Sequence, residues 1–295
     1  MLNISWRGYF WATLLFSIST LPVSADDGEL KKSGTKELLE KSTALAKSGR
    51  MDEALQTASK AIGADPKNVD GYLLRSALYS RSMNYEKAIA DLDEALSLNP
   101  DMVAAYDLRG DLYLKSGAFK AAIADFDVYL KRRPERTPHH WRRGIAYYYA
   151  GEYVKGQEQF EGYQKVDSSD VENAVWRCLC MARGSNLKKA RAELLKIGHD
   201  SRVPMKEIYE LFGGEIKASE VLEAARAGDP PRERRDMHLF YAHLYLGLYY
   251  EVEGNQELAR KHITMAAEKY RIGHYMWDVA RVHAELFRKG RKVSK

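Results

Sequence analysis

The sequence predicts an all-α fold, a superhelical α-solenoid of antiparallel helical pairs closed by a capping helix. Prolines recur at Pro66, Pro100 and Pro134, a step of about 34 residues. Small and aromatic residues recur with the same step, and within each copy they fall at helical spacing. These positions are Ala54, Ala88 and Ala122; Ala58, Leu92, Phe126 and Phe160; Ala61, Ala95, Tyr129 and Tyr163; and Tyr79, Tyr113 and Tyr147.

Each recurring residue has a physical reason to stand where it does. Ala88 and Ala95 let two helices approach closely, and Gly117 provides the positive φ that a helix end often needs. Pro100 ends the second helix, because proline disfavours the helical conformation in the residue before it. One hairpin cannot bury its apolar face alone, so stacked copies form a superhelix with a concave surface. A period of about 34 residues with these small and aromatic positions is the tetratricopeptide signature.

The chain divides into segments by how regular this pattern is. The predicted N-terminal array contains about four helical pairs and begins, after a polar leader, with a pair over 36–64. In the irregular section the pattern predicts helices over 187–197, 206–212 and 218–226. After that, a final pair over 236–253 and 256–270 precedes a capping helix over 275–288. The predicted domains are a signal peptide (1–25), the array (26–168), an irregular helical connector (169–233), the C-terminal pair with its cap (234–290) and a basic tail (291–295).

The first residues have the pattern of an export signal. Arg7 supplies positive charge, residues 9–18 an apolar core, and Val23-Ser24-Ala25 a small-residue cleavage site. We therefore expect cleavage near Ala25 and a periplasmic or secreted protein; the alternative is an uncleaved anchor. No cysteine lies near this site, so no lipid anchor is expected.

Composition and motifs point away from several kinds of chemistry. The formal charge of +5 is modest and spread along the chain, so we expect no nucleic-acid partner. Cys178 and Cys180 lie two apart in a predicted helix, where side chains do not face each other. We interpret them as small apolar residues rather than a disulfide or metal site. The chain has no phosphate-binding glycine loop, nucleophile elbow or metalloprotease motif. Catalytic residues, cofactors and metals are therefore all predicted absent.

Beyond the repeat itself, the order of parts resembles the NlpI-type periplasmic adaptors of bacteria. The resemblance rests on residues 140–148, on Val175-Trp176, on residues 208–214 and on residues 240–250. It implies outer-membrane proteins that dimerise and bring proteases and peptidoglycan hydrolases together. This chain departs from that family because it lacks the lipidated cysteine.

The first helices of the pairs line the concave face of such an array, so their exposed positions are the candidate partner-binding residues. A solvated acidic face could accept basic side chains of a ligand. Trp141 could anchor a peptide, because aromatic residues dominate interface energetics; the alternative is that the aromatic rings pack between repeats. The candidates are Arg81, Asp107, Asp111, Lys115, Trp141, Ile145 and Tyr149.

The leading hypothesis is a non-catalytic exported adaptor that binds protein or peptide partners along its concave groove. The second is a structural scaffold of an envelope complex that associates with itself, and a homodimer is part of that hypothesis. The third is an enzyme with a site in the irregular section, between residues 171 and 231. Fold alone does not decide among them, since one repeat scaffold binds unrelated ligands.

Overall fold

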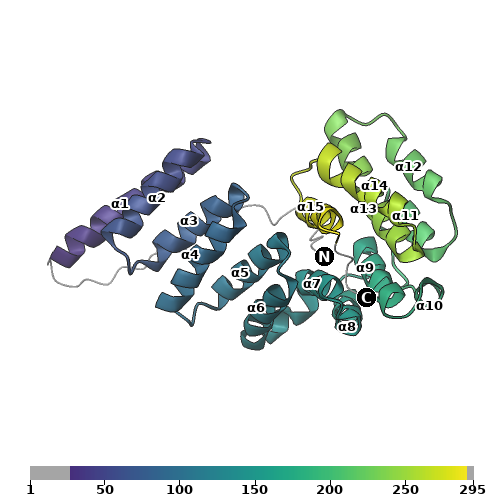
Figure 1. Ribbon diagram of the computed structural model, residues 1–295, viewed down its shortest axis with the longest axis horizontal. Coiled ribbons are helices and arrows are strands. Elements are labelled where there is room, and N and C mark those ends of the chain that lie inside the picture. The colour runs from purple at the N-terminus through teal and green to yellow at the C-terminus, as the bar shows by residue number, and fades with distance from the viewer. Residues whose placement is uncertain (1–26, 291–295) are drawn as a thin grey trace. The chain divides into compact units, whose positions relative to one another are not determined.

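The protein is described here from a computed structural model, and its described residues are 27–290. The predicted all-α fold is confirmed, and no strand occurs among these residues. Antiparallel helices follow one another as an α-solenoid (Figure 1). The predicted signal peptide and basic tail lie outside the described residues. None of the helices in the described range has the length and apolar content that a membrane crossing needs.

The helices fall into pairs that follow the predicted repeats. Most predicted bounds are reproduced to within a few residues. The helices are α1 (Asp27–Lys47), α2 (Met51–Ala64), α3 (Val69–Arg81), α4 (Tyr85–Leu98), α5 (Val103–Ser116), α6 (Phe119–Arg132), η2 (Pro134–His139), α7 (Trp141–Ala150), α8 (Tyr153–Gln164), α9 (Val171–Gly184), α10 (Leu187–Ala192), α11 (Met205–Gly213), α12 (Ala218–Arg226), α13 (Arg232–Glu253), α14 (Gln256–Thr264), the π-helical turn η3 (Met265–Lys269) and α15 (Tyr275–Arg288).

The chain divides after Asn68 into two compact units, whose described parts are residues 27–68 and 69–290. In the described part of the first unit, α1 and α2 pack as a hairpin, and Ser42 Oγ donates a hydrogen bond to the Ala54 carbonyl at 2.7 Å. Helix α1 already begins at Asp27, within the stretch that the sequence assigns to a polar leader. The boundary between the units falls inside the predicted N-terminal array.

Within the second unit, glycines allow the close approach that the repeat requires. At Gly144, an added Cβ would lie 2.6 Å from the ring of Phe160, closer than packed carbon atoms come. Gly110 stands in the same relation to Phe126, at 2.7 Å. Both rings are almost fully buried. The recurring aromatic positions therefore fill the space that the glycines leave, which explains the pairing of small and large residues in the pattern.

An arginine ladder that the sequence analysis does not predict also runs through the repeats. Its members share the repeat step and lie on the first helix of each pair. Each guanidinium bonds to the second helix of its own pair or to the chain just after it. From the second member on, each also bonds to the second helix of the preceding pair. The ladder consists of Arg75, Arg109, Arg143 and Arg177.

Two members of the ladder show how it connects three helices. Arg109 on α5 pairs with Asp125 on α6 and with Asp93 on α4, each at 2.7 Å. One repeat later, Arg143 bonds to Gln159 on α8 at 2.9 Å, where a neutral amide replaces the carboxylate. The Asp125 side chain is only 8% exposed. Each regular repeat therefore contains one polar contact between an arginine on its first helix and a buried acceptor on its second helix.

The C-terminal half shares one hydrophobic core with the fourth repeat. Helix α9 is buried along almost its whole length, and α11 and α13 pack against it. Helix α10 ends at Ala192, although the sequence predicts a helix to residue 197. Beyond Ala192, side chains donate hydrogen bonds to backbone carbonyls in place of the expected helical turn. Arg177 donates to the Glu193 carbonyl at 2.6 Å, and Gln164 donates to the Lys196 carbonyl at 2.9 Å.

Candidate binding surface

The candidate residues of α5 form a half-buried charge network rather than an open acidic face. Arg142 Nη2 lies 2.7 Å from Asp107, and Arg142 Nη1 lies 3.2 Å from Asp111. His140 Nε2 donates to Asp107 at 2.8 Å, and Lys115 lies 2.7 Å from Asp111. Both carboxylates therefore already have cationic partners within the chain.

The pKa values of these carboxyls follow from the same contacts. Burial alone would raise the pKa of Asp107, but Arg142 and His140 outweigh it and hold that pKa at about 2. Burial likewise opposes ionisation of Asp111, while Lys115 and Arg142 outweigh it and lower its pKa. Both groups are ionised and paired at neutral pH. A basic ligand would consequently have to compete with the protein's own cations.

The candidate residues of α7 are covered as well. Ile145 is 1% exposed and Tyr149 is 4% exposed. The Tyr149 ring stacks on Phe119 with ring centroids 4.9 Å apart. Trp141 meets the ring of Tyr275 edge to face at 4.8 Å. Trp141 is therefore in contact with an aromatic side chain of the chain's own last helix.

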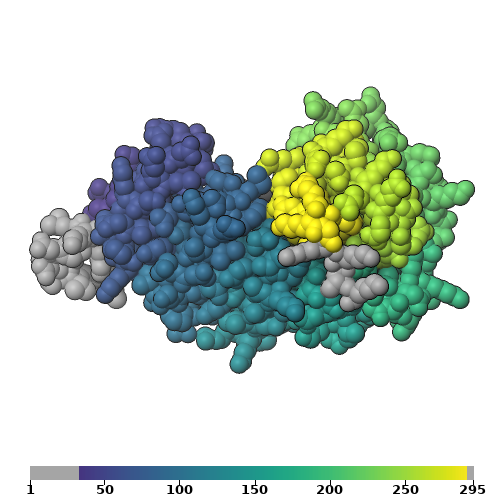
Figure 2. Space-filling model, viewed as in Figure 1, coloured from purple at the N-terminus to yellow at the C-terminus, as the bar shows by residue number. Residues whose placement is uncertain are grey.

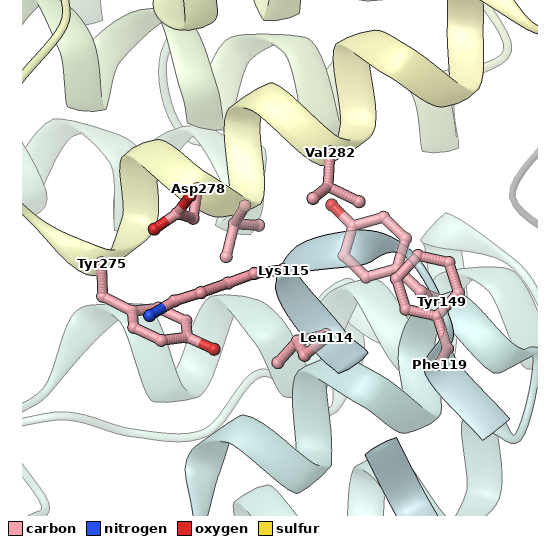
Figure 3. Close-up of a pocket in the computed structure, with 8 residues that line it drawn as sticks. Leu114, Lys115, Phe119, Tyr149, Tyr275, Asp278 and Val282 are labelled. Atoms are coloured by element: carbon pink, nitrogen blue, oxygen red, sulfur yellow. The ribbon is translucent and has the colours of Figure 1, made fainter. Parts of the chain in front are cut away.

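That last helix, α15, lies across the face of α5 and α7 on which these candidates stand. We call this surface, formed by α3, α5 and α7, the inner face. In the space-filling view the yellow residues of α15 lie directly against the blue residues of the repeats (Figure 2). Figure 3 shows Asp278 and Val282 of α15 above Lys115 and Tyr149, and the Tyr275 ring beside the end of the Lys115 side chain, around a small pocket at this seam.

Polar contacts tie α15 to the start of α4 and the end of α5. The Tyr85 hydroxyl donates to Asp278 at 2.8 Å, and Arg281 donates to the Lys115 carbonyl at 2.6 Å. The Arg281 guanidinium also lies over the Tyr85 ring, 5.1 Å from its centroid. Deeper in the seam, His283 Nδ1 and the Tyr149 hydroxyl are 3.0 Å apart. The sequence reasoning found α15 but none of these contacts.

A second set of contacts holds α15 to the C-terminal pair. Trp277 Nε1 donates to the Ala267 carbonyl at 2.9 Å, and Arg260 donates to the Phe287 carbonyl at 2.9 Å. Arg288 pairs with Glu268 at 2.7 Å. Helix α15 therefore packs against the repeats with one face and against α14 and η3 with another.

Part of the inner face is open. Arg81 on α3, the remaining candidate, is exposed, and so is Ala77 one turn before it. Leu108 is 41% exposed and lies on α5 three residues before Asp111, so the two share one side of the helix. Arg81 on α3 is thus exposed, whereas the candidates on α5 and α7 lie under α15.

The irregular section contains a buried polar cluster centred on Arg202. Its guanidinium lies 2.7 Å from Asp170 and 2.7 Å from Glu172, and it also pairs with Asp200. Burial and the neighbouring Glu172 raise the pKa of Asp170 to about 7. Tyr245 donates to Glu172 at 2.6 Å, which ties α9 to α13. These contacts join helices, and among residues 27–290 no group of acidic, histidine or cysteine side chains has a metal-binding arrangement.

The two cysteines are buried, as expected of packing residues. Cys178 is 1% exposed and Cys180 is fully buried, and neither forms a disulfide. Burial raises the pKa of the Cys178 thiol to about 12. A Cβ at Gly156 would lie 2.7 Å from the Cys180 sulfur, so the pair again matches a glycine with a larger neighbour.

Comparison with known families and structures agrees with this architecture. Two family models described as tetratricopeptide repeat match residues 38–68 and 75–141. A tetratricopeptide repeat protein from Parabacteroides merdae is 17% identical, with a TM-score of 0.55 over 86% of this chain and 98% of its own. MamA from Desulfovibrio magneticus is 18% identical, with a TM-score of 0.50 over 66% of this chain and 97% of its own. A search of curated proteins finds no match.

Proposed function

Since the chain is a tetratricopeptide repeat protein, we propose that it is a non-catalytic adaptor that holds helical segments of partner proteins on its inner face. One observation carries the proposal: a helix, α15, already lies on the part of this face formed by α5 and α7. The surface therefore has the shape and the hydrogen-bonding groups to receive a helix. Recognition of a helix laid into a groove is a common mode of protein binding.

The open part of the inner face gives a partner its first point of contact. Ala77 and Arg81 are exposed on α3, and Leu108 is exposed on α5. The open part borders the seam, because Arg271, just before α15, contacts Met83 just after α3. A partner segment bound there would lie beside the N-terminal end of α15.

We further propose that the adaptor works outside the cytoplasm. The proposal rests on Arg7, the apolar stretch 9–18 and the small residues before Asp26. The first partners to test are envelope proteases and peptidoglycan hydrolases, because the chain resembles the NlpI-type adaptors. Mass measurement of the purified protein tests the export signal: a mature chain beginning at Asp26 supports cleavage, and an intact N-terminus in the envelope fraction points to an anchor.

Site-specific photo-crosslinking in the full-length protein tests the binding surface. A photoreactive residue replaces Ala77 or Leu108 on the inner face, and in the control it replaces Val154 on α8, which is 66% exposed. We expect the same defined adducts from positions 77 and 108 and none of them from position 154. The change Leu108→Asp should abolish the adducts formed from position 77. Equal labelling from position 154 would mean that the inner face is not the binding surface.

A further inference from the structure

The last helix is an amphipathic segment with two distinct sides. Tyr275, Asp278 and Val282 recur at spacings of three and four and face the repeats. Trp277 and Phe287 lie toward the C-terminal pair, where they make the backbone hydrogen bonds described above. The two sides have separate partners except at His283, which lies 3.0 Å from Tyr149 on α7 and 3.4 Å from Glu251 on α13. Substitutions can therefore remove the repeat-facing contacts of Asp278 and Arg281 without removing those of Trp277.

The seam between α15 and the repeats joins side chains that lie far apart in the sequence. Its contacts include hydrogen bonds and ring contacts between residues more than about 130 positions apart in the sequence. A small pocket lies within the seam, between Lys115, Phe119 and Val282. Protein interiors normally leave few such spaces. By contrast, backbone carbonyls at both ends of α15's contact with the C-terminal pair accept hydrogen bonds, those of Ala267 from Trp277 and of Phe287 from Arg260.

From these observations we infer that α15 is a self-ligand that closes the inner face, and that a partner binds by presenting a helix with the same pattern in its place. This inference rests on the proposed function. The pattern is an aromatic residue, an aspartate three residues later and an arginine three residues after that, as in Tyr275, Asp278 and Arg281. Each side chain has a defined place on the repeats: Trp141 for the ring, the Tyr85 hydroxyl for the acid, and the Lys115 carbonyl for the arginine.

Closure has a measurable consequence for affinity. A protein whose binding-competent state is only a fraction of the population binds with an affinity reduced by that fraction. Loosening the repeat-facing side of α15 should therefore strengthen binding of a helix supplied from outside. Loosening the side of α15 that faces α14 and η3 should leave this affinity unchanged, since the contacts on that side do not cover the inner face.

The test uses the full-length protein and a fluorescent peptide with the sequence of residues 274–289. The opened variant is Asp278→Ala with Arg281→Ala, and the matched control is Arg288→Ala, which removes only the pair with Glu268. We expect the opened variant to bind the peptide at least ~10-fold more tightly than wild type, and the control to bind like wild type. A peptide with Asp278 and Arg281 replaced by alanine should lose the added affinity.

Hydrogen exchange on α5 and α7 reports whether the seam has opened, with Val282→Asp as a second opening variant. If exchange rises and wild type binds the peptide as tightly as the opened variant does, closure by α15 is refuted while helix binding stands. If exchange rises and no form binds the peptide, helix binding by the inner face fails as well. If exchange rises in neither variant, α15 is a permanent part of the fold and the inference is overturned.

Discussion

Replacing Arg109 with alanine tests whether the arginine ladder stabilises the fold by neutralising buried carboxylates. The repeat supplies its own control, because Arg143 occupies the same position one copy later and faces the neutral Gln159 instead of Asp125. Both changes remove the same side chain from equivalent helices. Each also leaves behind one half-exposed carboxylate, Asp93 or Asp127, at 51% exposure. The two variants therefore differ mainly in the buried group that loses its partner.

The magnitudes follow from burial. Removing one partner of a buried ion pair costs ~3–5 kcal/mol. We take the lower end, about 3 kcal/mol, because the Arg109 side chain is 18% exposed and water can reach the site. Leaving a neutral amide oxygen of Gln159 without its donor costs about 1 kcal/mol. The half-exposed aspartates contribute well under ~1 kcal/mol in either case. Arg109→Ala should thus cost about 2 kcal/mol more than Arg143→Ala.

Urea unfolding followed by far-UV circular dichroism measures both losses, with the slope m checked for equality between variants. The second change Asp125→Asn should rescue Arg109→Ala to about the stability of Arg143→Ala, since it removes the unpaired charge. Equal losses in the two single variants would refute the reasoning. So would a failure of Asp125→Asn to rescue, because the buried charge would then not be the source of the cost.

Two further predictions concern packing and pH. At Gly144 the added methyl of alanine would meet the buried Phe160 ring, so Gly144→Ala should destabilise the protein by ~1–3 kcal/mol in thermal unfolding. Gly63→Ala, with nothing within 4 Å, should be neutral or stabilising, and equal effects would contradict this account. Burial lowers the pKa of His243 and His262, whose Nδ1 atoms are 3.0 Å apart, to about 4. Because these folded-state values lie below the ordinary 6.5, the unfolded chain binds more protons. Stability should fall as the pH drops from 7.5 to 5.0, by ~2 kcal/mol per imidazole. His262→Phe should reduce that loss in urea unfolding, and an unchanged pH dependence would show that another group is responsible.

The repeats could be predicted from the sequence because their determinants are local. Gly144 and Phe160 stand sixteen residues apart within one hairpin, and Gly110 and Phe126 make the same contact one copy earlier. The helix bounds over 218–226 and 275–288 are reproduced because Gly, Pro and capping residues mark them. The bounds fail where tertiary contacts take over, as at α10, whose expected last turn is replaced by side-chain hydrogen bonds to Glu193 and Lys196.

The arginine ladder was visible in the sequence and was still missed. Arg75 and Arg109 follow the repeat step, but a charged residue beside an apolar stripe is usually read as solvent-exposed. Its partners, Asp91 and Asp125, follow the same step and would have indicated the pairing. Arginine and aspartate positions that recur together with the repeat step are therefore the sequence signal that indicates the ladder.

The covering of the inner face by α15 had no comparable signal. The contacts of Asp278 with Tyr85 and of Arg281 with Lys115 join residues more than 150 positions apart. Such contacts depend on how far the intervening helices turn, which local patterns do not specify. The candidate residues on α5 and α7 were therefore correctly placed on the first helices of their pairs, yet their exposure was overestimated.

The charges beneath α15 determine what kind of helix the inner face selects. Asp107 and Asp111 are already matched by Arg142 and Lys115, so a partner gains little by bringing additional cations. Selection then falls to groups whose hydrogen-bond partners lie on α15 itself, chiefly the Lys115 carbonyl and the Tyr85 hydroxyl. A ligand helix that supplies one acid and one arginine brings no net charge to this surface. The peptide of residues 274–289 has three basic and two acidic residues, a formal charge of +1. Its binding by the opened variant should accordingly change less than ~3-fold between low and physiological salt, because screening acts mainly on unbalanced charge. A steep salt dependence in the anisotropy titration would instead mean that unbalanced charge, rather than the Lys115 carbonyl and the Tyr85 hydroxyl, determines peptide binding.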